Sequence, residues 1–182
     1  MRKILASFLE ILEVATIALG AVFLVRTFLI QPFLVNGGSM LPNFENGDYL
    51  LVDELAYRFR QPFRGEVVVF RYPQNESVYF IKRIIGLPGE TIQIKNGKVI
   101  IIPAGQSEGY ALSEKYLPPR LITGGNAEYK IDPDQYLVLG DNRSYSFDSR
   151  SWGPLNEKEI VGVVRLRLWP FQGLKVFAAE EY

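Results

Sequence analysis

A serine preceded by two glycines is the first feature of the sequence that could support chemistry. The segment Asn36-Gly37-Gly38-Ser39 lets the backbone turn sharply and approach a ligand closely, because glycine adopts conformations that other residues avoid. A serine hydroxyl is a weak nucleophile unless a neighbouring base takes its proton. Taken alone, such a segment is usually a flexible loop, so its meaning depends on which base the chain can supply.

The composition leaves few candidates for that base. The 182-residue chain has no His and no Cys, which excludes Ser-His-Asp triads, Cys-His pairs and imidazole or thiolate metal sites. Lys+Arg and Asp+Glu total 20 each and the basic residues are scattered, so the sequence does not indicate a nucleic-acid partner. A lysine that loses its proton near neutral pH is the main remaining candidate.

One lysine lies inside a strongly apolar segment. If residues 78–85 form a strand, Lys82 shares a face with Val78, Phe80 and Ile84, because alternate residues of a strand point the same way. Burial among such neighbours disfavours the ammonium form and lowers the pKa of a lysine. The alternative is an edge strand whose lysine points into solvent and keeps the sheet from associating with others.

A third segment, residues 140–150, is dense in hydrogen-bonding side chains. It contains two Asp, one Asn, two Arg and three Ser, directly after an apolar segment at 136–139. A solvated turn is one interpretation of this composition. A shell of residues that orients catalytic side chains is the other.

An apolar segment precedes all of these residues. Between Ile11 and Ile30 the only charged residues are Glu13 and Arg26, and a helix of that length spans roughly 30 Å, the thickness of a bilayer core. The basic residues at positions 2–3 predict that the N-terminus is cytoplasmic and that the rest of the chain is outside. The alternative is a cleavable signal peptide, with small residues at 18–20 near its cleavage site.

Strand patterns dominate the remainder of the chain. We expect strands at residues 49–52, 67–72, 78–85, 91–94, 99–102, 136–139 and 160–166. Asn96-Gly97, between two of them, predicts a type I′ hairpin turn. Residues 103–129, rich in Gly, Pro and Ser, form an excursion that can hold short strands of its own. The sequence thus predicts a cytoplasmic tip and anchor at 1–31 and a mostly β domain at 32–182.

The chemical segments, taken in order, resemble the successive motifs of bacterial type I signal peptidases. The matching segments are Ser39-Met40-Leu41-Pro42, residues 79–90, residues 140–143 and Asp148-Ser149-Arg150. The resemblance covers almost the whole chain except about 103–129. It implies a mostly β fold in which a single transmembrane helix is followed by a catalytic domain of coiled antiparallel sheets.

The same resemblance implies a catalytic dyad. Ser39 is expected to be the nucleophile, and neutral Lys82 the general base that takes its proton, returns it to the leaving amine and then activates water. Some family members carry a serine two residues before the nucleophile that stabilises the oxyanion, but this chain has Gly37 there. The oxyanion would then rest mainly on the backbone N–H of Ser39, with Gly37 uncertain and the second donor not identified.

Four further residues are implied as supporting groups. Ser146 is expected to hydrogen-bond the lysine and orient it, and Asp148 and Arg83 to form a salt bridge. Arg150 is expected to belong to the same polar layer, whereas residues 141–143 are assigned to structure rather than chemistry.

The resemblance also implies the biological setting. The expected reaction is cleavage of exported preproteins after the small-x-small end of a signal peptide, which lies extended against strand edges near the membrane. The enzyme would be single-pass in the plasma membrane, with its N-terminus cytoplasmic and its catalytic domain extracytoplasmic. The partners would be preprotein signal peptides and the lipid bilayer, with no nucleic acid, metal or other cofactor. Five apolar residues are candidates for either lipid contact or the core: Phe33, Leu34, Val35, Phe59 and Phe63.

Three alternatives differ from this prediction. A self-cleaving repressor-type Ser-Lys protease would carry a DNA-binding domain where this chain has an apolar segment. A mitochondrial inner-membrane signal peptidase has the same features, so the sequence does not separate it. A catalytically inactive, membrane-tethered β domain would bind exported polypeptides without cutting them, although no dyad residue is missing here.

Overall fold

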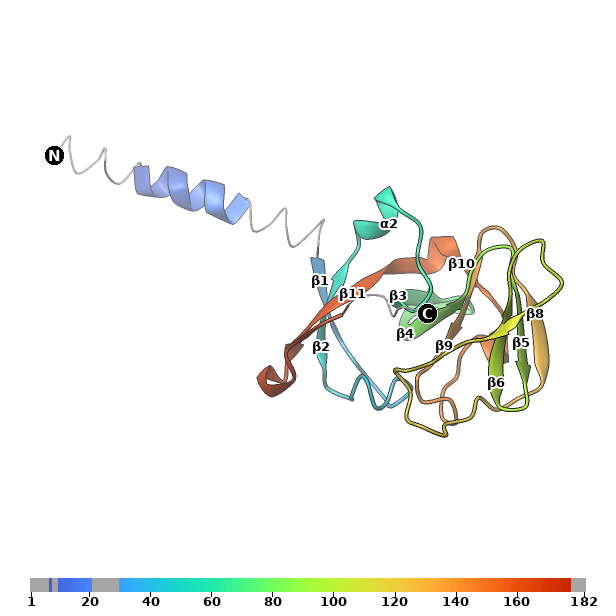
Figure 1. Cartoon of the computed structure of the whole chain (residues 1–182). Coiled ribbons are helices and arrows are strands. Elements are labelled where there is room, and N and C mark those ends of the chain that lie inside the picture. Colours follow the sequence, from blue (N-terminus) through green and yellow to red (C-terminus); the bar gives the residue numbers. More distant parts are fainter. Residues whose placement is uncertain (1–6, 8–9, 21–29, 178–182) are drawn as a thin grey trace.

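The computed structural model describes residue 7 and residues 10–20 and 30–177 (Figure 1). Residues 10–20 are helical, and within the described part of the chain no helix is long and apolar enough to cross a membrane. The predicted span therefore lies partly outside the described residues, at 21–29. The first strand, β1 (Ile30–Leu34), contains the predicted boundary at residue 31 and was not expected from the sequence.

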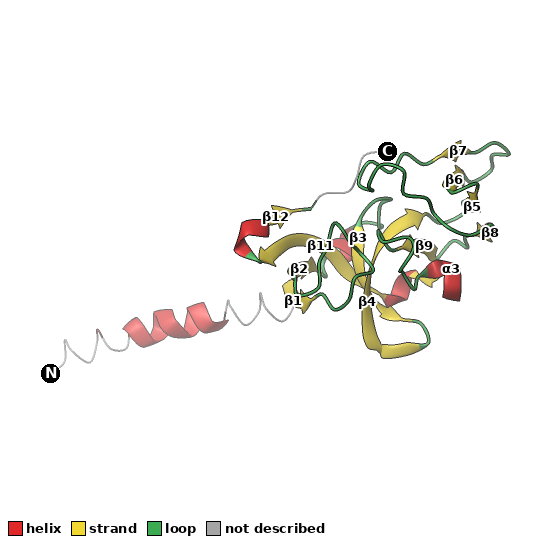
Figure 2. Cartoon of the chain, turned by 90° about the horizontal axis from the view of Figure 1, so that it is seen from below, coloured by secondary structure: helices red, strands yellow, loops and turns green. Residues whose placement is uncertain are grey.

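A large antiparallel sheet forms one part of the β domain (Figures 1 and 2). In spatial order its strands are β1, β2 (Tyr49–Asp53), β11 (Ile160–Trp169), β3 (Val67–Tyr72), β4 (Asn75–Gly86), β9 (Gln135–Leu139) and β10 (Leu155–Asn156), with β12 (Lys175–Val176) paired to β11. Register shifts interrupt the pairing of β11 with both β2 and β3, and such irregularities increase the twist of a sheet. The predicted mostly β, antiparallel architecture is confirmed.

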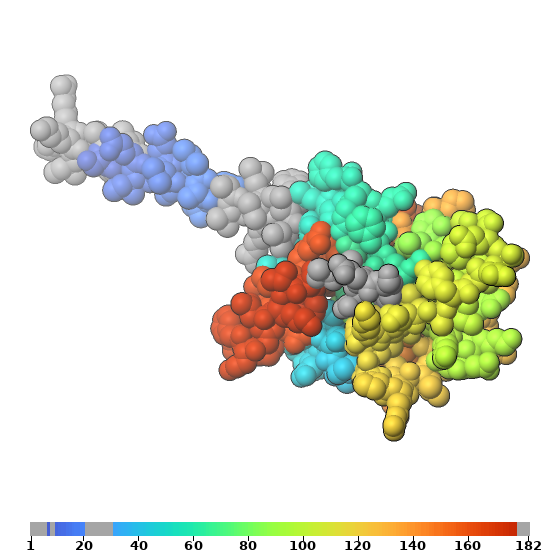
Figure 3. All heavy atoms as spheres, viewed as in Figure 1, coloured from blue at the N-terminus to red at the C-terminus, as the bar shows by residue number. Residues whose placement is uncertain are grey.

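A second antiparallel sheet has the order β7-β6-β5-β8. Its centre is the predicted hairpin of β5 (Thr91–Lys95) and β6 (Lys98–Ile102), whose turn residues Asn96 and Gly97 have φ angles of 53° and 76°. Its outer strands, β7 (Tyr110–Ala111) and β8 (Ala127–Lys130), come largely from the excursion at 103–129. In the space-filling view, these green and yellow residues gather at one end of the domain (Figure 3).

Four short helical segments connect the strands. They are α2 (Ala56–Phe59), α3 (Ser149–Trp152) and the 3-10 turns η1 (Glu157–Glu159) and η2 (Phe171–Gly173). The α3 segment begins at Asp148, whose side chain accepts a hydrogen bond from the Arg150 backbone N–H, as a helix-capping residue does.

Three clusters of buried apolar residues fill the domain, and one of them lies directly behind the serine loop. Met40 and Phe44, just after Ser39, are 1% and 0% exposed and pack with Val35 from the end of β1. Val35 thus belongs to the core, whereas Phe59 and Phe63 are exposed. Burial of Met40 and Phe44 fixes the loop in which Ser39 lies.

Candidate active site

Ser39 lies in the loop that joins β1 to β2. Its carbonyl oxygen accepts a hydrogen bond of 3.0 Å from the Asn142 backbone N–H, and the carbonyl oxygen of Gly38 accepts one of 2.9 Å from Asn142 Nδ2. Gly37, two residues before Ser39, has a φ of 93°, a conformation that favours glycine. The Gly-Gly-Ser segment is therefore a shaped loop held from the β9–α3 segment, rather than a flexible linker.

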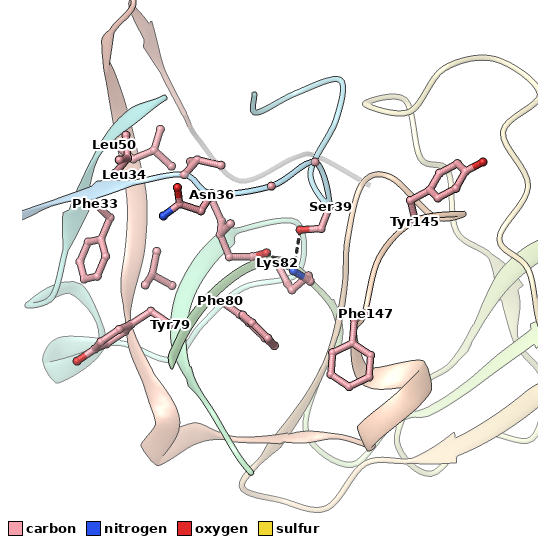
Figure 4. Close-up of a pocket in the computed structure, with 15 residues that line it drawn as sticks. Phe33, Leu34, Asn36, Ser39, Leu50, Tyr79, Phe80, Lys82, Tyr145 and Phe147 are labelled. Atoms are coloured by element: carbon pink, nitrogen blue, oxygen red, sulfur yellow. Dashed lines mark hydrogen bonds between the residues drawn. The ribbon is translucent and has the colours of Figure 1, made fainter. Parts of the chain in front are cut away.

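Lys82 reaches Ser39 from the middle of β4. Its Nζ donates hydrogen bonds to Ser39 Oγ at 2.9 Å and to the Ile81 carbonyl oxygen at 2.8 Å (Figure 4). The residue is 3% exposed and pairs with Val68 of β3, so the alternative of a solvated edge-strand lysine is wrong. The Nζ also lies 5.1 Å from the centre of the Phe80 ring. The structure thus brings together the two residues that the sequence singled out.

The environment of Lys82 favours the neutral amine. Burial lowers the pKa of Lys82 from 10.5 to about 8, and the negative charges of Asp148 and Asp141 oppose this shift without cancelling it. For each unit by which the pKa of a lysine exceeds the working pH, forming the neutral amine costs about 1.4 kcal/mol. Near neutral pH the neutral amine is therefore accessible, which is the requirement for a general base.

The expected supporting residues are present, but their ion pairs differ from the expectation. Arg83 makes two hydrogen bonds to Asp141, Nε to Oδ1 at 2.9 Å and Nη2 to Oδ2 at 2.7 Å. Asp148 pairs with Arg150 in the same two-point manner, at 2.8 and 2.9 Å. Arg83 and Asp148, which we expected to pair with each other, thus each have a different partner. Arg150 does lie in the polar layer, where the prediction placed it.

Asp148 is an ionised, buried anchor of this layer. Burial alone would raise the pKa of Asp148, but hydrogen bonds from Arg150 and from the Gly140 backbone N–H outweigh burial, and the net shift is downward. The Gly140 N–H lies 2.9 Å from Asp148 Oδ2. The carboxylate therefore fixes both ends of the 140–150 segment.

Ser146 lies close to the nucleophile loop. A Cβ added to Gly140 would fall 2.2 Å from Ser146 Oγ and 2.4 Å from the Ser39 carbonyl oxygen. Ser146 Oγ is buried and contributes to the low pKa of Asp148. It has no hydrogen bond of good geometry within the described ranges, so the expected hydrogen bond from Ser146 to Lys82 is not formed in this conformation. Only a glycine at 140 lets these two segments approach so closely.

Two structural contacts between the site and the excursion were not predicted from the sequence. Asn43 Nδ2 donates to Asp141 Oδ2 and to the Tyr116 carbonyl oxygen, both at 2.9 Å, and so ties the nucleophile loop to the excursion. The buried Arg143 guanidinium pairs with Glu114, also from the excursion. The position of Asn43 directly after the Ser-Met-Leu-Pro motif was the one available signal for it.

The backbone N–H of Gly37 is engaged in a hydrogen bond. It donates to Asn46 Oδ1 at 2.9 Å. An oxyanion could use this donor only if the Asn46 side chain released it, so Gly37 offers no free donor in this conformation.

Ser39 and Lys82 open onto a cleft of about 310 Å³. Its apolar side chains come from the β1 end, from β2, β3 and β4, and from the 140–150 segment: Phe33, Leu34, Val35, Leu50, Val69, Tyr79, Phe80, Ile81, Tyr145 and Phe147. The polar atoms of the dyad thus meet a mainly apolar groove, a common form for a site that binds a ligand. Tyr145 and Phe147 were not predicted to belong to it.

Comparison with known proteins finds several signal peptidases. A signal peptidase I from Leptolyngbya laminosa is 39% identical over 172 residues, covering 88% of this chain and 80% of its own. Signal peptidase I P from Bacillus subtilis subsp. natto is 34% identical over 180 residues, covering 93% and 94%. A crystal structure of a signal peptidase I from Enterococcus faecalis V583 matches 57% of this chain and 97% of its own, with 28% identity and a TM-score of 0.48.

The match of this chain to a protein-family model also covers most of its length. The model of the family described as signal peptidase, peptidase S26, matches residues 8–169, a range that includes both dyad residues and the complete 140–150 segment. The chain therefore belongs to the signal peptidase family, peptidase S26, whose members are serine endopeptidases.

Proposed function

We propose that the protein is a membrane-bound signal peptidase that cleaves signal peptides from exported preproteins with a Ser39–Lys82 dyad. The observation that carries the proposal is the 2.9 Å contact between Ser39 Oγ and the Nζ of a lysine that is 3% exposed. Family membership supplies the reaction class, and the relatives named above supply the substrate class.

The first chemical step is acylation of the serine. Neutral Lys82 accepts the hydroxyl proton as Ser39 Oγ attacks the carbonyl carbon at the cleavage site. Lys82 then gives the proton to the leaving amide nitrogen as the C–N bond breaks, which leaves an ester on Ser39 and releases the new N-terminus. The oxyanion is stabilised mainly by the backbone N–H of Ser39.

The second step releases the signal peptide. Lys82, neutral again, takes a proton from a water molecule that attacks the ester carbonyl, and the proton returns to Ser39 Oγ as the ester breaks. The salt-bridged carboxylates Asp141 and Asp148 hold the loops in place, so their role is positional.

The shape of the cleft supports an extended peptide as substrate. Two of the segments that line the cleft are residues 33–39, from the end of β1 and the loop after it, and residues 79–82 of β4. A peptide laid between two strand segments can form main-chain hydrogen bonds to them and place alternate side chains in apolar depressions. An apolar groove of this kind suits the small-x-small pattern before the cleavage site.

The membrane setting rests on the sequence around the described helix. Glu13 and Arg26 are the only charged residues between positions 11 and 30, and we assign this segment to an anchor that, together with a cytoplasmic tip, occupies residues 1–31. The anchor is single-pass, with the basic N-terminus in the cytoplasm and residues 32–182 outside, in contact with the bilayer surface.

Cleavage of a preprotein in detergent or lipid tests the proposal. We expect the activity of the original chain to rise with pH near neutrality and to vanish in Lys82→Met. The matched control is Lys95→Met, because Lys95 is exposed at the end of β5. If the original chain binds preproteins but cuts none, or if Lys82→Met cuts equally well, the protein is the non-catalytic binding domain instead.

A further inference from the structure

The active-site cleft has two distinct sides, and the dyad lies between them. In Figure 4 the side chains of Phe33, Leu34 and Leu50, carried by β1 and β2, lie on one side of Ser39 and Lys82. Tyr145 and Phe147, from the segment between β9 and α3, lie on the other. We call these last two residues the aromatic wall.

The aromatic wall is held in place but stays accessible. The Phe147 ring lies 5.9 Å from the ring of Tyr72 and 6.4 Å from that of Phe80, both in edge-on geometry. Its side chain remains 51% exposed, and that of Tyr145 is 84% exposed. The Tyr145 backbone N–H donates to the Asn142 carbonyl oxygen at 3.0 Å, which fixes the segment. The packed, half-exposed Phe147 ring and the largely exposed Tyr145 ring beside it are suited to contact a ligand.

Proton transfer decides which part of the substrate this wall faces. The proton that Lys82 takes from Ser39 must reach the leaving amide nitrogen, so that nitrogen must come within hydrogen-bonding distance of Lys82 Nζ. The Nζ lies 5.1 Å from the centre of the Phe80 ring, and Phe80 is the neighbour of Phe147. The side of the cleft next to the lysine nitrogen and the aromatic wall is therefore the side of the leaving group.

We propose that Phe147 and Tyr145 form the subsite for the first residues of the mature protein, on the C-terminal side of the cleaved bond. The inference rests on the proposed function and deepens it, because it assigns specificity beyond the signal peptide itself. Phe147, which packs against the Phe80 ring beside Lys82, contacts the first of these residues, and Tyr145 contacts a later one. Uncharged aromatic rings favour apolar side chains there over glycine.

The test uses the full chain in detergent and a set of preproteins that differ only in the first residue after the cleavage site. We expect the ratio of kcat/KM for leucine over glycine at that position to fall about tenfold in Phe147→Ala, since one lost apolar contact has roughly that effect. Phe147→Tyr should retain the ratio. Tyr145→Ala should change the preference at the second or third position instead.

Phe33→Ala is the matched control from the opposite wall, and it should alter preference only before the cleaved bond. A Phe147→Ala variant that slows all substrates equally would overturn the proposal, because the ring would then only support the fold. A preference change confined to residues before the cleaved bond would also overturn it, since the substrate would then run in the opposite direction. If the original chain cleaves none of the preproteins, the proposed function itself fails.

Discussion

Arg83 and Asp141 form a buried two-point salt bridge one residue away from Lys82, the proposed general base, with N–O distances of 2.9 and 2.7 Å. The exposed fractions of the two side chains are 4% and 0%. The Arg83 guanidinium also donates to the Gly65 carbonyl oxygen at 2.8 Å and lies 4.0 Å from the centre of the Tyr116 ring. This pair therefore joins β4, which carries Lys82, to the segment after β9, where the Asn142 backbone N–H donates to the Ser39 carbonyl oxygen.

Asp141→Ala should strongly destabilise the protein, because it removes the carboxylate that Arg83 pairs with in the interior. Loss of one partner of a buried ion pair costs about 3–5 kcal/mol. Chemical unfolding followed by the fluorescence of Trp152 and Trp169 measures this effect. Asp132→Ala, at an exposed carboxylate, is the control and should change the free energy of unfolding little. Equal effects of the two substitutions would show that the salt bridge contributes nothing.

Gly140→Ala should abolish activity and reduce stability. The new methyl group would lie 2.4 Å from the Ser39 carbonyl oxygen, a backbone atom that cannot move without displacing the nucleophile. Overpacking of this kind costs roughly 1–3 kcal/mol. Gly124→Ala is the control, because a methyl group there meets nothing within 4 Å. Full activity in Gly140→Ala would mean that the spacing between the two loops is not required.

The strands could be predicted because they have local signals, whereas the pairing of Ser39 with Lys82 was implied by the resemblance of the ordered motifs to a family. Alternating or continuous apolar residues mark β3, β4 and β9, but an isolated lysine in such a segment fits either a buried position or a solvated edge strand. Strand β1 has no such signal, since Gln31 and Pro32 interrupt its apolar residues and it lies at the edge of the sheet, where proline is tolerated.

The ion pairs and the aromatic wall could not be predicted either, but the reason differs from that for β1. Segment 140–150 offers two aspartates to Arg83, and only the register of β4 with β9, which pairs Arg83 with Leu139, brings Asp141 to it. Phe147 and Tyr145 are exposed aromatic residues in a polar segment without periodicity, so no pattern assigns them to a cleft. Both features depend on which loops meet in three dimensions.

The charge of Asp148 should influence the pH profile of catalysis. Its negative charge raises the pKa of Lys82, partly offsetting the effect of burial. Asp148→Asn should therefore lower that pKa further and move the rising limb of kcat/KM against pH to lower pH, whatever it does to the maximal rate. Asp132→Asn provides the control. An inflection that stays in place or moves to higher pH would contradict the assignment of Lys82 as the base.

The burial of Lys82 should also appear in the pH dependence of stability. Its pKa is about 8 in the folded chain and 10.5 as an ordinary lysine, so between these values the unfolded chain holds a proton that the folded chain lacks. Stability therefore rises with pH from about 8 to 10.5, and below pH 8 the full penalty, about 3 kcal/mol, is present.

Lys82→Met removes the titrating group and should be more stable than the original chain at pH 7 by up to about 3 kcal/mol. The difference in unfolding free energy between the two chains should shrink steadily from pH 8 towards pH 10.5. Lys95→Met, measured in parallel, should show no such trend, because Lys95 is exposed in the folded state. A difference that is the same at every pH would show that the folded chain does not lower the pKa of Lys82, and the dyad would then lack its base.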